Sequence, residues 1–300
     1  MIELMSRLLD YIKATKYNIG FVEGSLESII EGEPIKVNWM KHSYKDRWFA
    51  DPFILDITDN DFIVLVEEWY DPIQRGRITK LTVDRNTFEL KSMKVMIDEG
   101  SHLSFPAITR KNNEIYIQPE NSVTDQLVEY KYHSDSDSFE KYAIISDLPL
   151  TDSVRTTYFG EDLLFSTKLP DANGKELGIY LWDEVQIKYC IRDLYHFSDN
   201  ISRMAGNFFI CNGRIFRPAQ VCIKSYGDAV SIQEVSNESG KWNFKEVRRI
   251  YSPAKDFDLG FHTFNEYKGV VVVDGLGYRR PRLSRFLRGI KNMVKNMRMV

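Results

Sequence analysis

The stretch RWFADPFIL, residues 47–55, has the pattern of an apolar β-strand with one charged interior position, Asp51, directly followed by a proline. Similar strand-like runs begin about every fifty residues along the chain, each near a polar residue. The equivalent positions are Asp51, Ser104, Asp152, Arg203 and His262, at spacings of 53, 48, 51 and 59 residues. A repeat of this length, with four strands in each full set, is typical of a β-propeller. The alternative is a pair of β-sandwiches whose spacing is accidental.

The last repeat has too few strands to form a blade by itself. It offers only the runs 261–265 and 270–274, whereas the early runs 19–22 and 35–39 belong to no other set. We therefore predict an all-β fold, a five-bladed β-propeller over residues 17–277 that is closed by N-terminal strands. The 16 Tyr, 18 Phe and 5 Trp favour strands throughout. Apolar residues at helical spacing add a short N-terminal helix over residues 1–16.

Charge is unevenly distributed along the chain. The net charge is −3, but residues 278–300 contain eight basic side chains and no acidic one, which leaves −11 on residues 1–277. Apolar residues recur at helical spacing in the same segment, and Pro281 suits a helix start. We expect a basic amphipathic helix that either lies on an anionic membrane surface or packs on the acidic body. Nucleic acid is not an expected partner, because the rest of the chain is acidic.

Targeting signals and cysteine usage favour the cytoplasm. No run approaches the roughly 20 apolar residues of a membrane-spanning helix, and the N-terminus lacks the pattern of a signal peptide. The three cysteines, Cys190, Cys211 and Cys222, match neither a disulfide framework nor a metal cluster. We expect a cytoplasmic protein, peripheral on the inner face of the membrane if the tail binds lipid.

In a propeller, the start of each first strand and the end of each second strand meet at one mouth of the central channel, a common place for ligands. These positions carry polar groups in every repeat. They are Asp51, Glu67, Glu68, His102, Glu120, Asp152, Arg203, Arg217, Gln220, His262, Asn265 and Asp274. Core packing alone would not require this recurrence, so the mouth is the predicted functional site. Neither His102 nor His262 has a convincing third ligand, and we expect no metal and no other cofactor.

Several motifs carry a family resemblance. Ala50-Asp51-Pro52-Phe53 resembles the first-blade signature of five-bladed propeller glycosidases of the arabinanase and β-xylosidase type. The wider set is similar to a family of bacterial propellers, often encoded with surface-polysaccharide genes, that also forms the N-terminal domain of plant glucosamine inositolphosphorylceramide transferases. The matching segments are FADPF (49–53), VEE (66–68), HLSFP (102–106), PE (119–120), Asp152, RMAG (203–206), RPAQ (217–220), YG (226–227) and GFHTFN (260–265).

The resemblance implies that Asp51 is a general base and that Asp152, 101 residues later, is the carboxylate that orients it. The glycosidases also use an acid on the fourth blade, where this chain has Arg203, Arg217 and Gln220. A glycoside needs protonation of its leaving oxygen, whereas a phosphate leaves without it and needs cations to hold its charge. We therefore predict a glycosyltransferase-like enzyme that uses an activated, phosphorylated or nucleotide sugar donor and a glycan acceptor in cell-surface polysaccharide biosynthesis.

The predicted site divides into catalytic and substrate-binding residues. The catalytic group is Asp51, Asp152 and Glu120, and the substrate-binding group is Glu68, His102, Arg203, Arg217, Gln220, His262 and Asn265. Two other functions remain open at this point. Glu120 or Glu68 could act as a displaced general acid, which would make the chain a glycoside hydrolase, or the propeller could bind glycans without catalysis.

Overall fold

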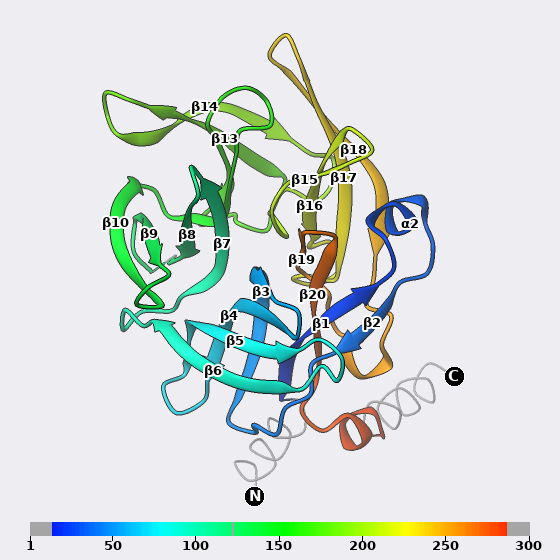
Figure 1. The fold of residues 1–300 in the computed structure, drawn as a ribbon. Helices are drawn as coiled ribbons and strands as arrows, with labels where there is room; N and C mark the ends of the chain where they lie inside the picture. The colour runs from blue at the N-terminus through cyan, green and yellow to red at the C-terminus, as the bar shows by residue number, and fades with distance from the viewer. Residues whose placement is uncertain (1–13, 122, 287–300) are drawn as a thin grey trace, which may run out of the picture.

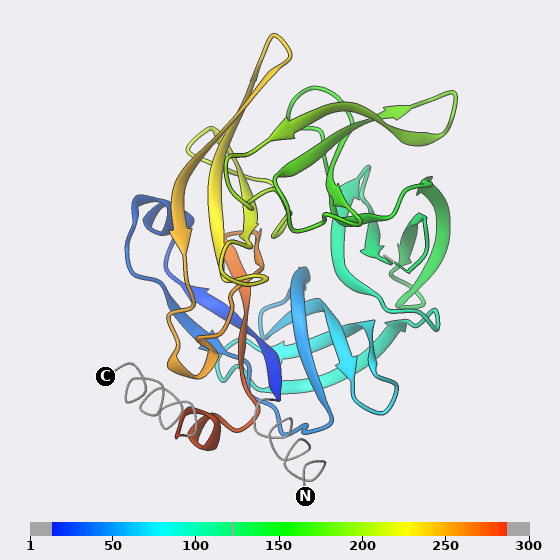
Figure 2. The ribbon, with the colours of Figure 1, turned by 180° about the vertical axis from the view of Figure 1, so that it is seen from behind.

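The computed structural model describes residues 14–121 and 123–286, which form a ring of five β-sheets around a common axis (Figures 1 and 2). Each sheet has four antiparallel strands, so the predicted all-β, five-bladed propeller is confirmed. One edge strand of each blade lies near the axis, and the opposite edge strand lies at the rim. We number the blades 1 to 5, beginning with the sheet that contains β3.

Blades 1 to 4 follow the chain from the inner strand to the rim. Blade 1 is β3 (Arg47–Ile57), β4 (Asp61–Tyr70), β5 (Arg75–Asp84) and β6 (Leu90–Ile97). Blade 2 is β7 (Ser104–Lys111), β8 (Glu114–Glu120), β9 (Leu127–His133) and β10 (Ser138–Ser146). Blade 3 is β11 (Leu150–Thr156), β12 (Leu163–Lys168), β13 (Glu176–Asp183) and β14 (Lys188–His196). Blade 4 is β15 (Phe209–Cys211), β16 (Arg214–Val221), β17 (Ala229–Glu238) and β18 (Lys241–Ile250).

Blade 5 joins strands from the two ends of the chain. Its order is β19 (Phe264–Tyr267), β20 (Val270–Tyr278), β1 (Thr15–Glu23) and β2 (Lys36–Trp39). β1 pairs with β20 over eight residue pairs, and the two strands lie side by side in Figure 1. The predicted closure by N-terminal strands is therefore correct. A short helix, α2 (Leu26–Glu31), connects β1 to β2, and a 3-10 turn, η1 (Lys255–Phe257), lies between β18 and β19.

Aromatic side chains fill the space between neighbouring blades. Phe53 of blade 1 and Phe105 of blade 2 pack edge to face, with ring centroids 5.0 Å apart. Phe165 of blade 3 meets Trp242 of blade 4 in the same way at 5.3 Å. All four side chains are buried, and burying each one stabilises the fold by about 1.5–3 kcal/mol. The blades are thus held to one another by core contacts as well as by the chain.

The inner strands of blades 1, 2 and 3 share a β-bulge at the end where the predicted site residues lie. The pairing register shifts by one residue over 50–53, 104–107 and 151–154. The first bulged residue is left-handed in all three blades, with φ of 49° at Asp51, 45° at Phe105 and 46° at Asp152. Side chains other than glycine are strained there, and such strain concentrates at functional sites. Asp51 is therefore equivalent to Phe105 and not to Ser104, which corrects the predicted alignment by one residue.

The ends of the propeller differ slightly from the predicted bounds. β1 begins at Thr15, so the predicted N-terminal helix does not extend to residue 16; its residues 1–13 lie outside the described residues. β20 extends to Tyr278, and residues 281–286 are helical. The rest of the predicted tail helix, residues 287–300, also lies outside the described residues. None of the helical segments in the described part of the chain has the length and apolar character of a membrane-spanning helix.

Candidate active site

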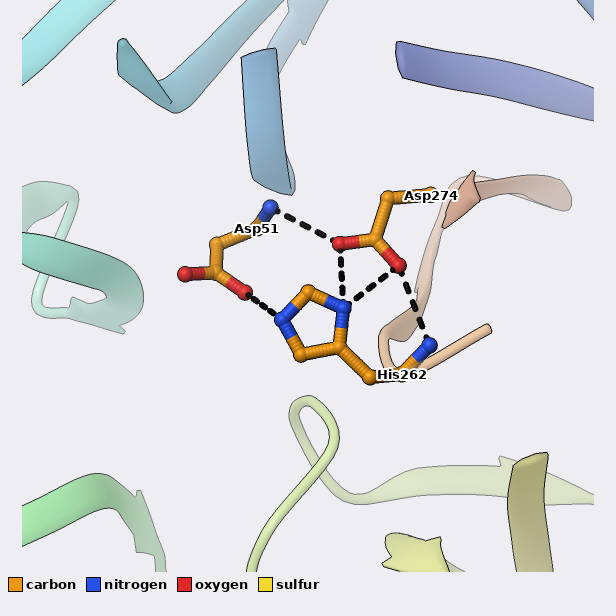
Figure 3. Close-up of side chains that lie close together, drawn as sticks. All are labelled: Asp51, His262 and Asp274. Atoms are coloured by element: carbon orange, nitrogen blue, oxygen red, sulfur yellow. Dashed lines mark hydrogen bonds and ion pairs between the residues drawn. The ribbon is translucent and has the colours of Figure 1, made fainter. Parts of the chain in front are cut away.

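Two carboxylates enclose a histidine at one mouth of the ring (Figure 3). Asp51 lies in the bulge of β3, His262 lies just before β19, and Asp274 lies in β20. His262 Nδ1 is 2.8 Å from Asp274 Oδ2, and His262 Nε2 is 3.1 Å from Asp51 Oδ1. All three residues are buried. Closure of the propeller therefore builds this cluster from the two halves of the chain.

Backbone N–H groups hold both carboxylates in place. Asp274 Oδ1 accepts hydrogen bonds from the backbone of His262 and Thr263, and Asp274 Oδ2 accepts one from Asp51, each at 3.1 Å. Asp51 Oδ2 accepts a hydrogen bond from the backbone of Phe105 at 3.1 Å. Among the described residues, no group donates a hydrogen bond of good geometry to Asp51 Oδ1. This buried oxygen is held by the charge of His262 alone.

The electrostatics of the cluster favour a charged imidazole beside a basic carboxylate. Burial opposes a charge on His262, but Asp274 and Asp51, together with nearby tyrosines, raise its pKa well above the ordinary value. Burial would raise the pKa of Asp274, but His262 lowers it. Burial raises the pKa of Asp51, and His262 opposes that rise only in part. Asp274 therefore keeps His262 protonated, and Asp51 is the more basic carboxylate.

A second cluster surrounds Arg203. Arg203 Nε donates a hydrogen bond to Asp152 Oδ2 at 2.5 Å, and Nη2 donates one to Glu120 Oε2 at 2.9 Å. Gln220 Nε2 donates to the same Asp152 oxygen at 2.6 Å. Burial raises the pKa of Glu120 to about 8, although Arg203 opposes the rise. Four of the predicted residues thus meet here, and the Arg203 guanidinium lies 5.2 Å from the ring centroid of Tyr226.

Aromatic rings form a wall along the first cluster. Tyr226 and Tyr17 flank His262, with ring centroids 5.4 and 4.8 Å from the imidazole. Tyr17 lies 5.3 Å from Trp48, which stacks on Trp69 at 5.5 Å with only 3° between the ring planes. Aromatic faces beside a few fixed polar groups suit a ligand with both apolar C–H faces and hydroxyl groups, as a sugar has.

Glu67 and His102 form a pair at the edge of this wall. Glu67 lies at the inner end of β4, opposite Ala50, and its side chain is 8% exposed. Glu67 Oε1 is 3.6 Å from Nε2 of His102, whose side chain is 34% exposed. Burial raises the pKa of Glu67 well above its ordinary value, and the negative charge of Asp51 adds to the rise. The predicted substrate-binding residue His102 therefore lies beside a carboxyl group to which the sequence had given no role.

Arg217, a predicted substrate-binding residue, lies away from the mouth. It is fully buried, and its guanidinium lies 5.2 Å from the ring of Phe197 and 5.4 Å from the ring of Phe244. Arg217 Nη1 donates to Gln233 Oε1 at 3.0 Å. Residues an odd number apart in a strand point to opposite faces, so Gln220 and Arg217 on β16 cannot both face the mouth.

Glu68 and Asn265 also have structural partners. Glu68 Oε1 accepts from Arg47 at 2.7 Å, and Oε2 accepts from Arg77 at 2.9 Å, on the face of β4 opposite to Glu67. Asn265 Nδ2 donates to the carbonyl of Pro52 at 2.9 Å, just beside Asp51. Asn265 thus supports the bulge, and Glu68 holds two arginines within blade 1.

Asp51, His262 and Asp274 also form the one group in the described part of the chain whose ligand atoms, within 4.8 Å of one another, could converge on a metal ion. Both ring nitrogens of His262 already contact a carboxylate, and backbone N–H groups occupy three of the four carboxylate oxygens. These are the contacts of an internally paired charge cluster. The expectation of no metal stays a prediction, and nothing proposed below requires one.

Comparison with known proteins identifies the family. Residues 36–266 match the family model described as Glucosamine inositolphosphorylceramide transferase 1, N-terminal. The chain belongs to this family. It is 26% identical over 217 residues to Glucosamine inositolphosphorylceramide transferase 1 of Oryza sativa subsp. indica, and 27% identical over 221 residues to that of Arabidopsis thaliana. These alignments cover 68% and 69% of this chain but only 28% of either relative, so the chain spans less than a third of their length.

Solved structures share the fold of this member of the Glucosamine inositolphosphorylceramide transferase 1, N-terminal family. A family 117 glycoside hydrolase from Zobellia galactanivorans superposes with a TM-score of 0.51 at 10% identity, covering 89% of this chain and 91% of the hydrolase. A GH43 enzyme from Xanthomonas citri complexed with xylotriose gives 0.52 at 10% identity, covering 78% and 88%. At such low identity the likeness concerns the fold alone. The family resemblance predicted from the motifs is confirmed.

The sequence did not predict the aromatic wall or the roles of Asp274 and Glu67. Trp48 lies three residues before Asp51, and its register partner Trp69 lies two residues after Glu67. The two tryptophans near predicted mouth residues were the sequence signal that could have predicted the aromatic wall. Asp274 was placed at the mouth, but only the fold shows that it contacts His262.

Proposed function

We propose that the chain transfers a glycosyl group at this mouth of the channel. In the proposal, Asp51 either activates the acceptor hydroxyl as a base or attacks the anomeric carbon as a nucleophile. The observation that carries the proposal is the state of Asp51, a buried carboxylate in a left-handed bulge, with a raised pKa and with one oxygen, Oδ1, that faces only the His262 imidazole among the described residues. A strained, desolvated carboxylate next to a fixed imidazolium is poised for proton transfer or attack.

The acceptor side of the proposal rests on the family. The relatives are named transferases, which supports transfer to an acceptor in preference to water, and the acceptor that we propose is a cell-surface glycan. The aromatic wall gives further support, because Tyr17, Trp48 and Tyr226 offer ring faces to sugar units beside Asp51. Water in place of the acceptor would give hydrolysis at the same site.

The donor is better matched by a neutral glycoside than by a phosphorylated sugar. Arg217 lies in the core, and Arg203 already pairs with two carboxylates, so neither cation is free for a phosphate. Asp51, Asp152 and Asp274 place three carboxylates at the mouth against the two cations Arg203 and His262, without counting Glu67 and Glu120, whose pKa values are raised. A pyrophosphate would meet repulsion from this excess of negative charge. The phosphorylated or nucleotide donor is therefore the second candidate, supported by the transferase names alone.

We also propose that residues 278–300 bring the enzyme to an anionic membrane surface on the cytoplasmic side. Leu283 and Phe286 are 42% and 66% exposed, which supports an apolar contact. The start of the segment is fastened to the body, because Arg279 forms a bidentate pair with Asp71 and Arg285 contacts Asp256. Sedimentation with vesicles containing phosphatidylserine, compared with purely zwitterionic vesicles, tests this proposal; equal binding to both would contradict it.

The catalytic proposal is tested with wild-type protein and two variants on a panel of aryl glycosides, glycosyl phosphates and nucleotide sugars, with oligosaccharide acceptors present. Loss of the proton-accepting group in Asp51→Asn should reduce turnover by about 10²–10⁴-fold. Asp56→Asn, also on β3 but 57% exposed, is the matched control and should stay at the wild-type rate. Undiminished turnover in Asp51→Asn, or no turnover of any donor by the wild type, would contradict the proposal.

A further inference from the structure

We propose that Glu67 is the proton donor to the leaving oxygen and that the substrate class is a neutral glycoside whose leaving group needs this proton. The inference rests on the proposed transfer at Asp51 and deepens it. It concerns a residue on blade 1 that the family resemblance does not assign.

Glu67 differs from the other carboxyl groups of the mouth in its partners. Asp51 and Asp274 contact the protonated His262, and Asp152 and Glu120 pair with Arg203. In the described part of the chain, Glu67 has no arginine or lysine within ion-pair distance, and its one basic neighbour at that distance is His102. A buried carboxyl group without a cation is more stable in its protonated form. Glu67 therefore carries the proton that a general acid needs.

His102 is itself neutral and presents an N–H to Glu67. Its Nδ1 accepts a hydrogen bond from the backbone N–H of Gly76 at 2.9 Å, so the proton of the neutral ring is on Nε2. This Nε2 is the atom that lies 3.6 Å from Glu67 Oε1. Burial lowers the pKa of His102, and Arg75 lowers it further, which keeps the ring neutral. The Nε2–H of His102 therefore faces the carboxyl group of Glu67 and favours the carboxylate that remains after Glu67 has given up its proton.

The backbone beside Glu67 fixes the carboxyl group in its place. A side chain at Gly76 would put its Cβ only 2.5 Å from Glu67 Oε1 and 2.6 Å from the carbonyl oxygen of Leu103. The carboxyl group therefore occupies the space that glycine leaves open. Its position is defined by packing, as a group that must meet a leaving oxygen requires.

The charged and titratable groups that face Glu67 come from three blades. They are Asp51 on β3, His102 and Glu120 of blade 2, and Tyr17, His262 and Asp274 of blade 5. Burial and the carboxylates among them raise the pKa of Glu67, and His262 opposes them. The raised pKa is in the direction that a general acid working near neutral pH needs.

Transfer breaks one bond to the anomeric carbon and forms another. The bond between the anomeric carbon and the leaving oxygen breaks, its electron pair goes to the oxygen, and the oxygen takes the carboxyl proton of Glu67. If Asp51 acts as a base, it removes the proton of the acceptor hydroxyl, whose oxygen bonds to the anomeric carbon. Asp51 then releases this proton to solvent, and Glu67 takes up a proton from solvent. If Asp51 acts as a nucleophile, Glu67 regains its proton from the acceptor hydroxyl in the second half of the reaction.

The test compares phenyl glycosides, which leave poorly, with 4-nitrophenyl glycosides, which leave without protonation, across common hexoses, pentoses and N-acetylhexosamines. Glu67→Gln should lose about 10²–10⁴-fold in kcat/KM on phenyl glycosides and far less on 4-nitrophenyl glycosides. Glu184→Gln, an exposed turn residue on blade 3, is the control and should lose nothing. Glu120→Gln is measured alongside and should lose equally on both substrates.

Each other outcome is decisive. Equal loss on both substrates in Glu67→Gln, or a loss confined to phenyl glycosides in Glu120→Gln, would overturn the assignment of the acid. Turnover of nucleotide sugars but of no glycoside would overturn the inference and leave the transfer proposal standing, whereas no turnover of any donor removes both. If Glu67→Gln does not fold, the wild type decides: the alkaline fall of kcat/KM must be steep with phenyl glycosides and weak with 4-nitrophenyl glycosides, and equal falls would contradict the proposal.

Discussion

Blades 1 and 3 each place a carboxylate in the same type of β-bulge. Asp51 and Asp152 each occupy the left-handed position of a one-residue bulge, with φ of 49° and 46°. Asp152 then receives two hydrogen bonds at one oxygen, from Arg203 and Gln220, whereas Asp51 Oδ1 has the imidazole of His262 as its one partner among the described residues. The same bulge thus presents one carboxylate that is tied into the structure and one that is available for chemistry.

The second strands of the two blades differ in the same way. Glu67 of blade 1 pairs with Ala50, and the equivalent position in blade 3 is Thr167, which pairs with Thr151. The two threonine hydroxyls lie 2.7 Å apart and satisfy each other. Blade 1 therefore has a titratable carboxyl group, that of Glu67, where blade 3 has two threonine hydroxyls that hydrogen-bond to each other. The partners of a repeated position, more than its backbone, decide what it can do.

The largest expected effect that separates the two blades is on stability. Asp152→Asn should lower the free energy of unfolding by about 3 kcal/mol, because it leaves Arg203 buried with a single carboxylate. Asp51→Asn should change it by less than about 1 kcal/mol, since removing a charge that burial disfavours offsets the lost contact with His262. Urea unfolding of both variants measures the difference. Equal losses would mean that the two bulges have the same role.

How far the sequence predicts this molecule depends on periodicity. The repeat of about fifty residues and the two spare N-terminal strands were sufficient for the five blades and their closure. Which face a side chain occupies was harder, because a one-residue shift reverses it. Glu67 and Glu68 are adjacent, and the bulge after Ala50 moves the register by one residue, so the choice between them required the coordinates. Arg217 was placed wrongly at the mouth for the same reason.

The spacing of residues in the sequence does not predict which side chains contact each carboxylate. Arg203 was expected to hold a phosphate, but Glu120 and Asp152 come from two other blades and use its charge. The bond between His262 and Asp274 likewise depends on how β19 and β20 meet. Asp51 itself could be predicted because it is the one charged interior position of an apolar strand and because Ala50-Asp51-Pro52-Phe53 resembles the glycosidase signature.

A smaller effect is expected in the pH dependence of stability. Glu120 of blade 2 is a titratable group at the mouth, whereas the equivalent residue of blade 3, Thr167, does not titrate. Burial raises the pKa of Glu120 from 4.5 to about 8. The unfolded chain then ionises before the folded one, so the stability present below about pH 4.5 is lost as the pH rises to about 8.

Urea unfolding at several pH values between these limits measures that loss. Glu120→Gln should flatten part of the slope, because it removes one of the groups that ionise between these limits. Thr167→Val, at the equivalent position of blade 3, is the control and should leave the slope unchanged. A wild type whose stability rises over the same interval would contradict the direction of the shift.

The smallest effect is expected from the aromatic wall, which blade 1 has and blade 3 lacks. Trp48→Leu removes a ring that stacks on Trp69 and flanks Tyr17, and it should raise KM for an oligosaccharide acceptor by about tenfold, corresponding to about 1.4 kcal/mol, with kcat little changed. Trp182→Leu on blade 3, where the ring packs on Tyr189, is the matched control. An unchanged KM in Trp48→Leu would place the acceptor elsewhere.

The seam of the ring has a consequence for how the protein is made. β1 is translated before the other described strands of the propeller, yet it can pair with β20 only after the chain up to Tyr278 has been made. Tyr17 belongs to β1, whereas His262 lies just before β19 and Asp274 lies in β20, which are the last two described strands of the propeller to be translated. The nascent chain therefore has no complete site until the ring shuts in its final assembly step. Activity in this protein reports that the whole propeller has been synthesised and closed.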